Sequence, residues 1–416
     1  MIQRQRTFTG VTFGSRSQRG RVLPLSGNDA VVDADFVGGI PQGWTFARTG
    51  NGTVRGLTGL LSTVGTDVPR FDHDQTTGLC RGLYMEGKRT NYLCWSETFS
   101  AAPADNNWSD SGDFLRYTWD NTAPDGTATA LQASCDVANA TCINSLSRTP
   151  SANAGCGTFS VWLRRVSGTG SIQITDNNGT NWTTVAVTSS WTRFQLPHRT
   201  TAQQCGIRIV TGGDAIQMWG AQLEDGSGAS SYIKTGSVAA SRNKDTLSFL
   251  GLTGVPPTAM TVLFDYTPVN EQSAGVNGGS GYPTIAGLFS GSNSGYRMLM
   301  VHTYTGLTNP RFLTRGYTGA TAAIGSFTGA TRTVLSNARC AVSFSGSATV
   351  TRLASINGAT ATGQTDGTGP VGSFDRIYVN NYNDQGNDDD YPCYLLRRIR
   401  VFPRAMSQAE LNVLTA

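Results

Sequence analysis

Short segments in which apolar and polar residues alternate recur along this chain. In its central part they are Thr158–Leu163, Ser171–Ile174, Trp191–Leu196, Cys205–Val210 and Ala215–Gly220. Later ones are Met260–Tyr266, Tyr296–Val301, Ala341–Phe344, Arg376–Val379 and Leu395–Phe402. A period of two sends successive side chains to opposite faces, so each segment predicts a strand with one buried and one solvated face.

Turn residues separate these segments, for example DNNG at 176–179 and GGD at 212–214. Regularly spaced short strands without helical periodicity predict antiparallel sandwiches. One helix is indicated, at the end of the chain, where Ser407 and Glu410 have the spacing of a capping box. We therefore predict an all-β protein made of two antiparallel β-sandwiches, preceded by an extended N-terminal anchoring segment.

The domain boundaries follow from changes in this pattern. Residues 1–43 have few aromatic residues and only short apolar pieces, so we expect an extended arm that orders when it binds a partner. Residues 44–80 read as a small hairpin segment with turn signals at residues 50–52 and 65–67. The pattern resets near residues 241–245, which predicts one sandwich over 81–242 and another over 243–416.

Composition and charge agree with such a fold and exclude some partners. Glycine makes up 50 of the 416 residues, as expected for many tight turns. The formal net charge is only +4, and we interpret the small basic clusters at residues 81–89 and 397–400 as strand-edge charges, so we expect no nucleic-acid partner. The N-terminus lacks an apolar stretch of signal-peptide length and no long apolar run follows, so we expect assembly in a cytoplasm and no membrane span.

The eight cysteines have no zinc-type spacing. Buried reduced thiols are the favoured interpretation for a cytoplasmic chain, and a Cys135–Cys142 disulfide is the alternative.

Six ordered stretches carry a resemblance to a known module. They are VPRFDHD at 68–74, GLYMEGKRTNYLCWSETFS at 82–100, TAPDGTAT at 122–129, GTFSVWLRR at 157–165, SSWTRFQL at 189–196 and AIQMWGAQLEDGSGASSYIKTG at 215–236. This order resembles a module of bacteriophage head-fibre, spike and tail-fibre proteins, which implies a jelly-roll sandwich like that of carbohydrate-binding modules.

The C-terminal part carries a second resemblance. Residues 397–414, RRIRVFPRAMSQAELNVL, are similar to the last strand and helix of concanavalin A-like (laminin G-like) lectin domains. That family implies a lectin-type sandwich that binds glycans or proteins, in some members with calcium.

Aromatic residues supply the candidate ligand contacts. Trp162, Trp191 and Trp219 lie mid-strand, so we interpret them as core residues, with a sugar-stacking platform as the alternative. The candidate ligand-binding residues are the aromatic residues in polar segments rich in turn residues: Trp108, Tyr117, Trp119 and Trp182. Local packing of these four is the alternative.

The acidic loop at residues 383–390 is the candidate cation site. Asp384, Asp388, Asp389 and Asp390 offer oxygen ligands that suit calcium, and a solvated turn is the alternative. No other cofactor is indicated.

Sequence motifs give no support for catalysis. The three histidines fall in separate regions, and no nucleophile elbow, zinc motif or phosphate-binding loop is present. We interpret Glu86 and Glu224, inside the resemblance stretches, as structural hydrogen-bond or ion-pair partners.

The two resemblances imply a non-enzymatic structural protein of a phage virion. We expect a head fibre, spike or tail fibre that attaches to other virion proteins through its N-terminal segment and contacts host surface glycans. A homo-oligomer, by analogy a trimer, would make such weak contacts multivalent. The alternatives are a virion-associated polysaccharide depolymerase and a purely structural capsid or tail decoration protein.

Overall fold

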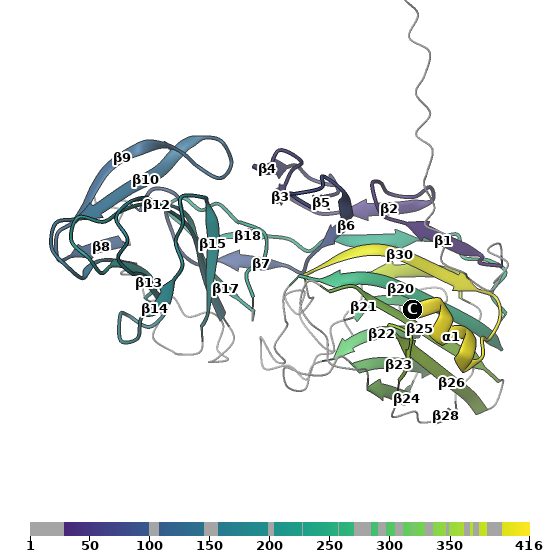
Figure 1. Ribbon diagram of the computed structural model, residues 1–416. Helices are drawn as coiled ribbons and strands as arrows, with labels where there is room; N and C mark the ends of the chain where they lie inside the picture. Colours follow the sequence, from purple (N-terminus) through teal and green to yellow (C-terminus); the bar gives the residue numbers. More distant parts are fainter. Residues whose placement is uncertain are drawn as a thin grey trace, which may run out of the picture.

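The computed structural model describes residues 29–99, 108–144, 157–198, 204–226, 228–256, 258–269, 284–289, 297–303, 311–318, 320–328, 336–346, 349–361, 367–368, 374–380 and 393–416. Apart from one short helix, the regular secondary structure of these residues consists of antiparallel strands, which confirms the predicted all-β class. Each of the ten alternating segments overlaps a strand. Figure 1 shows two lobes side by side, one built from β8–β17 and the other containing the C-terminus.

The first lobe is a sandwich of two five-stranded sheets. Sheet I has the order β15 (Thr192–His198), β12 (Gly157–Ser167), β17 (Ala215–Asp225), β10 (Ala128–Cys135), β9 (Phe114–Thr122). Sheet II has the order β14 (Thr183–Val185), β13 (Ile172–Thr175), β16 (Gly206–Ile209), β11 (Ala140–Asn144), β8 (Trp108–Ser111). The core between them includes Val161 and Leu163 of β12 and Ile207 and Ile209 of β16, all fully buried. Alternation therefore turns the residues between them toward the outer faces.

The second lobe is also a sandwich. Sheet III comprises β1 (Val32–Asp35), β5 (Phe71–His73), β6 (Cys80–Met85), β20 (Ala259–Pro268), β25 (Ala338–Ser345), β26 (Thr349–Ile356), β27 (Ala359–Thr360), β28 (Gly367–Thr368) and β30 (Tyr394–Phe402). Sheet IV comprises β2 (Trp44–Ala47), β19 (Thr246–Phe249), β21 (Thr284–Phe289), β22 (Arg297–Thr303), β23 (Arg311–Thr318), β24 (Ala320–Thr328) and β29 (Arg376–Val379). One buried apolar cluster draws on both sheets.

Two strand pairs stand apart from these sheets. The first is the hairpin of β3 (Gly52–Arg55) and β4 (Leu61–Val64). The second joins β7 (Arg89–Asn91) to β18 (Ala240–Arg242), so that Asn91 pairs with Ala240, 149 residues later in the sequence. The chain then enters the second sandwich at β19, which starts at Thr246.

The N-terminal strands correct two of our boundaries. We expected an extended arm over 1–43, but β1 pairs with β30, with Val32 opposite Val401, and Phe36 is fully buried in the second core. We expected a separate hairpin segment over 44–80, but β2 pairs with β19 and β5 pairs with β6. A short alternating segment indicates which face of a strand is buried, but it does not indicate which distant strand pairs with it. Residues 1–28 lie outside the described residues.

The C-terminal helix α1 (Gln408–Thr415) forms as predicted. Ser407 is its N-cap, and the Glu410 backbone N–H donates to the Ser407 side chain while the Glu410 carboxylate accepts from the Ser407 backbone, which confirms the capping box. Across the described ranges, no helix is long and apolar enough to cross a membrane. The seven described cysteines carry thiols rather than disulfides, and all but Cys80 are buried.

Candidate functional site

The structure separates the four aromatic residues proposed as ligand contacts. Trp108 is only 2% exposed, and its ring lies 4.8 Å from that of Phe99 in the first core, so its interpretation as a sugar-stacking residue was wrong. Although the residues next to it in the sequence are polar, Trp108 belongs to strand β8, which pairs with β11, and its side chain faces the core. Local packing, the alternative that we weighed, accounts for Trp108.

The other three do not converge either. Tyr117 is 54% exposed on β9 of sheet I. The backbone of Trp119 belongs to the same strand, but its side chain lies outside the described residues. Trp182 is half-buried in the loop between β13 and β14 of sheet II, with the Arg208 guanidinium 4.5 Å from its ring centre. The sites on the two sheets are therefore separate.

The predicted calcium ligands Asp384, Asp388, Asp389 and Asp390 lie outside the described residues. Within the part of the chain that the structure describes, no group of three histidine, cysteine, aspartate or glutamate residues could hold a metal.

A cleft lies where the β3–β4 hairpin faces the outer side of sheet I. It consists of two hollows of about 310 and 670 Å³, in the size range of ligand sites. Both hollows are lined by Arg55 and Leu61 of the hairpin and by Trp162 and Arg193 of sheet I, so they are adjacent. In Figure 1 the hairpin lies between the two lobes, close to the loop that joins β9 and β10.

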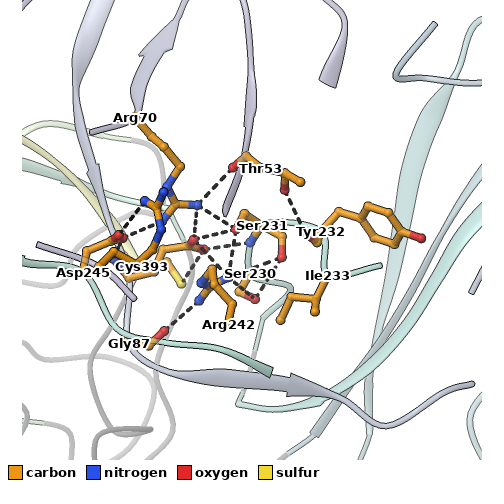
Figure 2. Close-up of polar contacts among 12 residues, drawn as sticks. Thr53, Arg70, Gly87, Ser230, Ser231, Tyr232, Ile233, Arg242, Asp245 and Cys393 are labelled. Atoms are coloured by element: carbon orange, nitrogen blue, oxygen red, sulfur yellow. Dashed lines mark hydrogen bonds and ion pairs between the residues drawn. The ribbon is translucent and has the colours of Figure 1, made fainter. Parts of the chain in front are cut away.

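Two hydrogen bonds to backbone carbonyls hold the hairpin in this position. The Leu61 N–H donates to the Pro124 carbonyl in the β9–β10 loop at 3.0 Å. The Thr53 hydroxyl donates to the Tyr232 carbonyl at 2.8 Å, a contact drawn in Figure 2. The wall of the cleft is thus fixed to the first sandwich at two points.

The floor of the cleft is aromatic. Trp162, Trp219 and Tyr232 form a cluster with ring centres 4.5–5.6 Å apart, separate from the core between the sheets. Trp162 points outward because its neighbours Val161 and Leu163 point inward. Trp219 is buried, as predicted for a core residue, but in this outer cluster.

A bulge allows the strands to pack over these rings. The pairing of β12 with β17 shifts register between Ser160 and Trp162, next to Gly220, whose φ is +65°. A Cβ atom at Gly220 would lie 3.0 Å from the Trp162 ring. The requirement for glycine at position 220 is therefore both conformational and steric.

Trp191 forms the accessible aromatic surface of the larger hollow. It is half-buried, its indole N–H donates to the Thr122 carbonyl at 3.1 Å, and the Arg164 guanidinium lies 5.0 Å from its ring centre. We had assigned Trp191 to the core, and it instead packs partly against the outer cluster and lines the cleft. A fixed, partly open indole of this kind can stack on the apolar face of a sugar ring.

Arginines surround the aromatic floor. The Arg193 guanidinium lies 4.4 Å from the Trp162 ring centre and donates to the Ser230 carbonyl at 2.5 Å and to the Ser160 hydroxyl at 2.9 Å. Its Nε is buried without a hydrogen-bond partner, and burial lowers its pKa. Arg164 donates through Nε to the Gln217 side chain.

One carboxylate lies at the opposite end, among the described residues that line the smaller hollow. Asp72 pairs with Arg81 at 3.2 Å. Burial raises the pKa of the Asp72 carboxyl above its usual range, although the charge of Arg81 acts in the opposite direction. Asp72 is the one carboxylate among the described lining residues of the two hollows.

Behind the cleft lies a buried ionic network of Arg48, Arg70, Glu86, Arg242 and Asp245, shown in part in Figure 2. Asp245 pairs with Arg48 at 3.1 Å and Arg70 at 2.5 Å, and Glu86 pairs with Arg70 at 2.7 Å and Arg242 at 3.1 Å. The side chains are 0–1% exposed.

Glu86 is the centre of this network. Burial acts to raise the pKa of its carboxyl, but the charges of Arg242 and Arg70 and hydrogen bonds from Ser231 lower it to about 2. Glu224 nearby accepts from the Ser230 backbone at 2.8 Å. The interpretation of both glutamates as structural partners is confirmed, and the network links segments of both sandwiches.

The stretches that carry the sequence resemblance contribute residues to both the cleft and the buried ionic network. SVWLRR supplies Trp162 and Arg164, and SSWTRF supplies Trp191 and Arg193. Both contain a tryptophan and an arginine two positions apart, which a strand places on one face. This repeated spacing was the available signal for the cleft, and we had not used it. Arg55 and Leu61 of the opposite wall gave no sequence signal.

Comparisons with known proteins give similarity of fold only. No family of known proteins matches the sequence, and no curated protein does. The receptor-binding domain of botulinum neurotoxin type G is 10% identical with a TM-score of 0.30, over 41% of this chain and 39% of that one.

Two further solved structures are similarly distant. Domain 4 of AbnA, a GH43 extracellular arabinanase from Geobacillus stearothermophilus, in complex with arabinotriose, is 15% identical with a TM-score of 0.29, over 45% of this chain and 82% of that one. The CBM22 tandem domain of Paenibacillus barcinonensis Xyn10C is 9% identical with a TM-score of 0.24, over 76% and 98%.

Proposed function

We propose that this protein binds glycans in the cleft between the β3–β4 hairpin and sheet I. The observation that carries the proposal is Trp191, a half-buried indole fixed by Thr122 and open to a hollow of about 670 Å³. A planar apolar ring bordered by polar donors such as those of Arg164 and Arg55 is the arrangement that recognises a sugar, whose ring has both an apolar face and hydroxyl groups.

We further propose that the glycan-binding protein is a structural component of a bacteriophage virion. This part rests on the sequence resemblance to head-fibre, spike and tail-fibre modules. The resembling stretches supply the cleft residues Trp162, Arg164, Trp191 and Arg193 of sheet I, which is the reason for joining the two proposals. In a virion, several copies of a weak sugar site would act together on a host surface.

The proposal includes binding without cleavage. Hydrolysis of a glycosidic bond generally uses two carboxylates on either side of that bond. The described lining offers Asp72, which is paired with Arg81. Incubation of the protein with a bound polysaccharide should release no reducing ends, and sugar release would refute this part.

Binding to a glycan array tests the proposed site. Wild type should retain at least one glycan, and Trp191→Ala should lose it. Trp182→Ala is the matched control, because Trp182 is also half-buried under an arginine, Arg208, but on sheet II. Loss of binding in the control alone would place the site on sheet II and contradict the proposal. No retention by wild type would refute glycan binding.

Immunogold labelling of phage particles tests the virion assignment. Antibody against this protein should decorate heads or tails of intact particles. Label found only in the lysate and never on particles would refute the assignment, while leaving the glycan test independent.

A further inference from the structure

We infer that the cleft selects acidic glycans, meaning saccharides with a carboxylate, sulfate or phosphate group. The inference rests on the proposed function and names its ligand class. Its starting point is a charge imbalance: the described lining of the larger hollow holds Arg55, Arg164 and Arg193 and no carboxylate. The smaller hollow adds Arg81, which is already paired with Asp72.

The cleft arginines differ from the arginines of the buried ionic network. Arg48, Arg70 and Arg242 are buried and each contacts Asp245 or Glu86 within 3.1 Å. None of the three cleft arginines has an ion pair with a carboxylate among the described residues. Arg164 is half-buried without a carboxylate in contact, and such a guanidinium is unfavourable, so a ligand that supplies an anionic group is favoured. Arg55 is exposed, and the charges of Glu224 and Glu86 act on Arg193 without an ion pair to it.

Their hydrogen-bonding capacity is also largely unused. A guanidinium has five N–H donors. Arg164 engages Nε with Gln217, and Arg55 engages Nε with the Gly59 carbonyl at 2.9 Å. No contact of the described residues uses the terminal nitrogens of Arg164 or Arg55, so these nitrogens remain available to a ligand. Arg193 engages each terminal nitrogen once, so one hydrogen on each is left.

The positions of these groups suit one saccharide. Arg164 lies over Trp191, and Arg193 lies over Trp162, its partner across the strand pair β12–β15. Trp162 and Arg164 are two residues apart on one strand, a distance of roughly 7 Å. A sugar ring stacked on Trp191 therefore carries its substituents next to guanidinium groups, which bind planar or tetrahedral oxyanions through paired N–H donors.

Sheet II provides an internal control of matched chemistry. There the Arg208 guanidinium lies 4.5 Å from the Trp182 ring centre and donates to Gln173 at 2.8 Å through Nε. Arg164, Trp191 and Gln217 repeat this arrangement on sheet I, but with the cleft and two further arginines beside them. Because Ile207 and Ile209 point into the core, Arg208 faces the opposite side of the sandwich.

Calorimetric titration with matched probes tests the inference. The pairs are trigalacturonate against its methyl ester, 3′-sialyllactose against lactose, and sulfated lactose against lactose. At about 50 mM NaCl the acidic member of at least one pair should bind at least about tenfold more tightly, the size of one charge-assisted hydrogen bond. The preference should shrink at high salt, which screens exposed charges. The pair that responds identifies the anionic group.

Variants locate the preference. Arg164→Gln and the exposed Arg55→Gln should each reduce the acid preference several-fold, whereas Arg208→Gln should leave it unchanged, with thermal midpoints confirming that each variant is folded. If Arg164→Gln does not fold, Arg55→Gln carries the test. Equal binding of acidic and neutral members, or an unchanged preference in the folded cleft variants, overturns the acidic inference while glycan binding stands. No binding of any probe or array glycan overturns both.

Discussion

Substitution of Asp245 by asparagine tests the role of the buried ionic network. The Asp245 carboxylate contacts Arg48 at 3.1 Å and Arg70 at 2.5 Å, and it accepts the Glu86 backbone N–H at 3.0 Å. Both ion pairs have fully buried side chains. Asparagine keeps the shape but removes the charge, which leaves two buried guanidinium groups around a neutral amide. Removal of one partner from a buried pair destabilises a protein by about 3–5 kcal/mol.

Denaturation by urea, followed through tryptophan fluorescence, measures this loss. The control is Asp33→Asn, because Asp33 pairs with Arg398 at 2.6 Å and with Arg400 at 3.3 Å but its own side chain is 32% exposed. An exposed pair contributes about 1 kcal/mol or less, so the control should shift the midpoint little. The reasoning is refuted if Asp245→Asn shifts the midpoint no more than Asp33→Asn does.

Three further outcomes follow from the same structure. The fold lowers the pKa of Glu86 from 4.5 to about 2, so the contribution of its carboxylate to stability is complete above pH 4.5 and is lost as the pH falls toward 2. The urea midpoint should therefore decline from pH 7 to pH 4 and again to pH 3. A midpoint that does not change with pH would contradict this. Gly220→Ala should destabilise by at least about 1 kcal/mol through strain at positive φ and contact with Trp162, visible as a lower thermal midpoint; no change would show that the bulge relaxes. Ser407→Ala should remove about 1 kcal/mol from α1, with Ser407→Asp restoring part of it.

Much of the fold could be predicted from residue alternation. Segments such as Thr158–Leu163 and Met260–Tyr266 lie within β12 and β20, so alternation located these strands. The expected solvated face was wrong for both, because these stretches are buried on both faces. The C-terminal helix could be predicted as well, because its Ser407–Glu410 capping box depends only on residues within one helical turn.

Long-range pairing could not be predicted in the same way. Alternation in Val32–Asp35 indicates a strand, but nothing local shows that its partner is β30, with Val32 opposite Val401. The same limit misplaced the candidate site. Trp191 and Trp182 both lie beside turn residues, and only the sheet arrangement, together with the β3–β4 hairpin, places one of them in a cleft.

Hydrogen–deuterium exchange with and without the array glycan that binds best locates the binding site in the wild-type protein, without any variant. We expect protection of backbone amides that border the cleft, in residues 55–61, 122–126 and 190–193. Protection confined to residues 177–185 on sheet II, or none at saturating glycan, would contradict the claim that this cleft is the binding site.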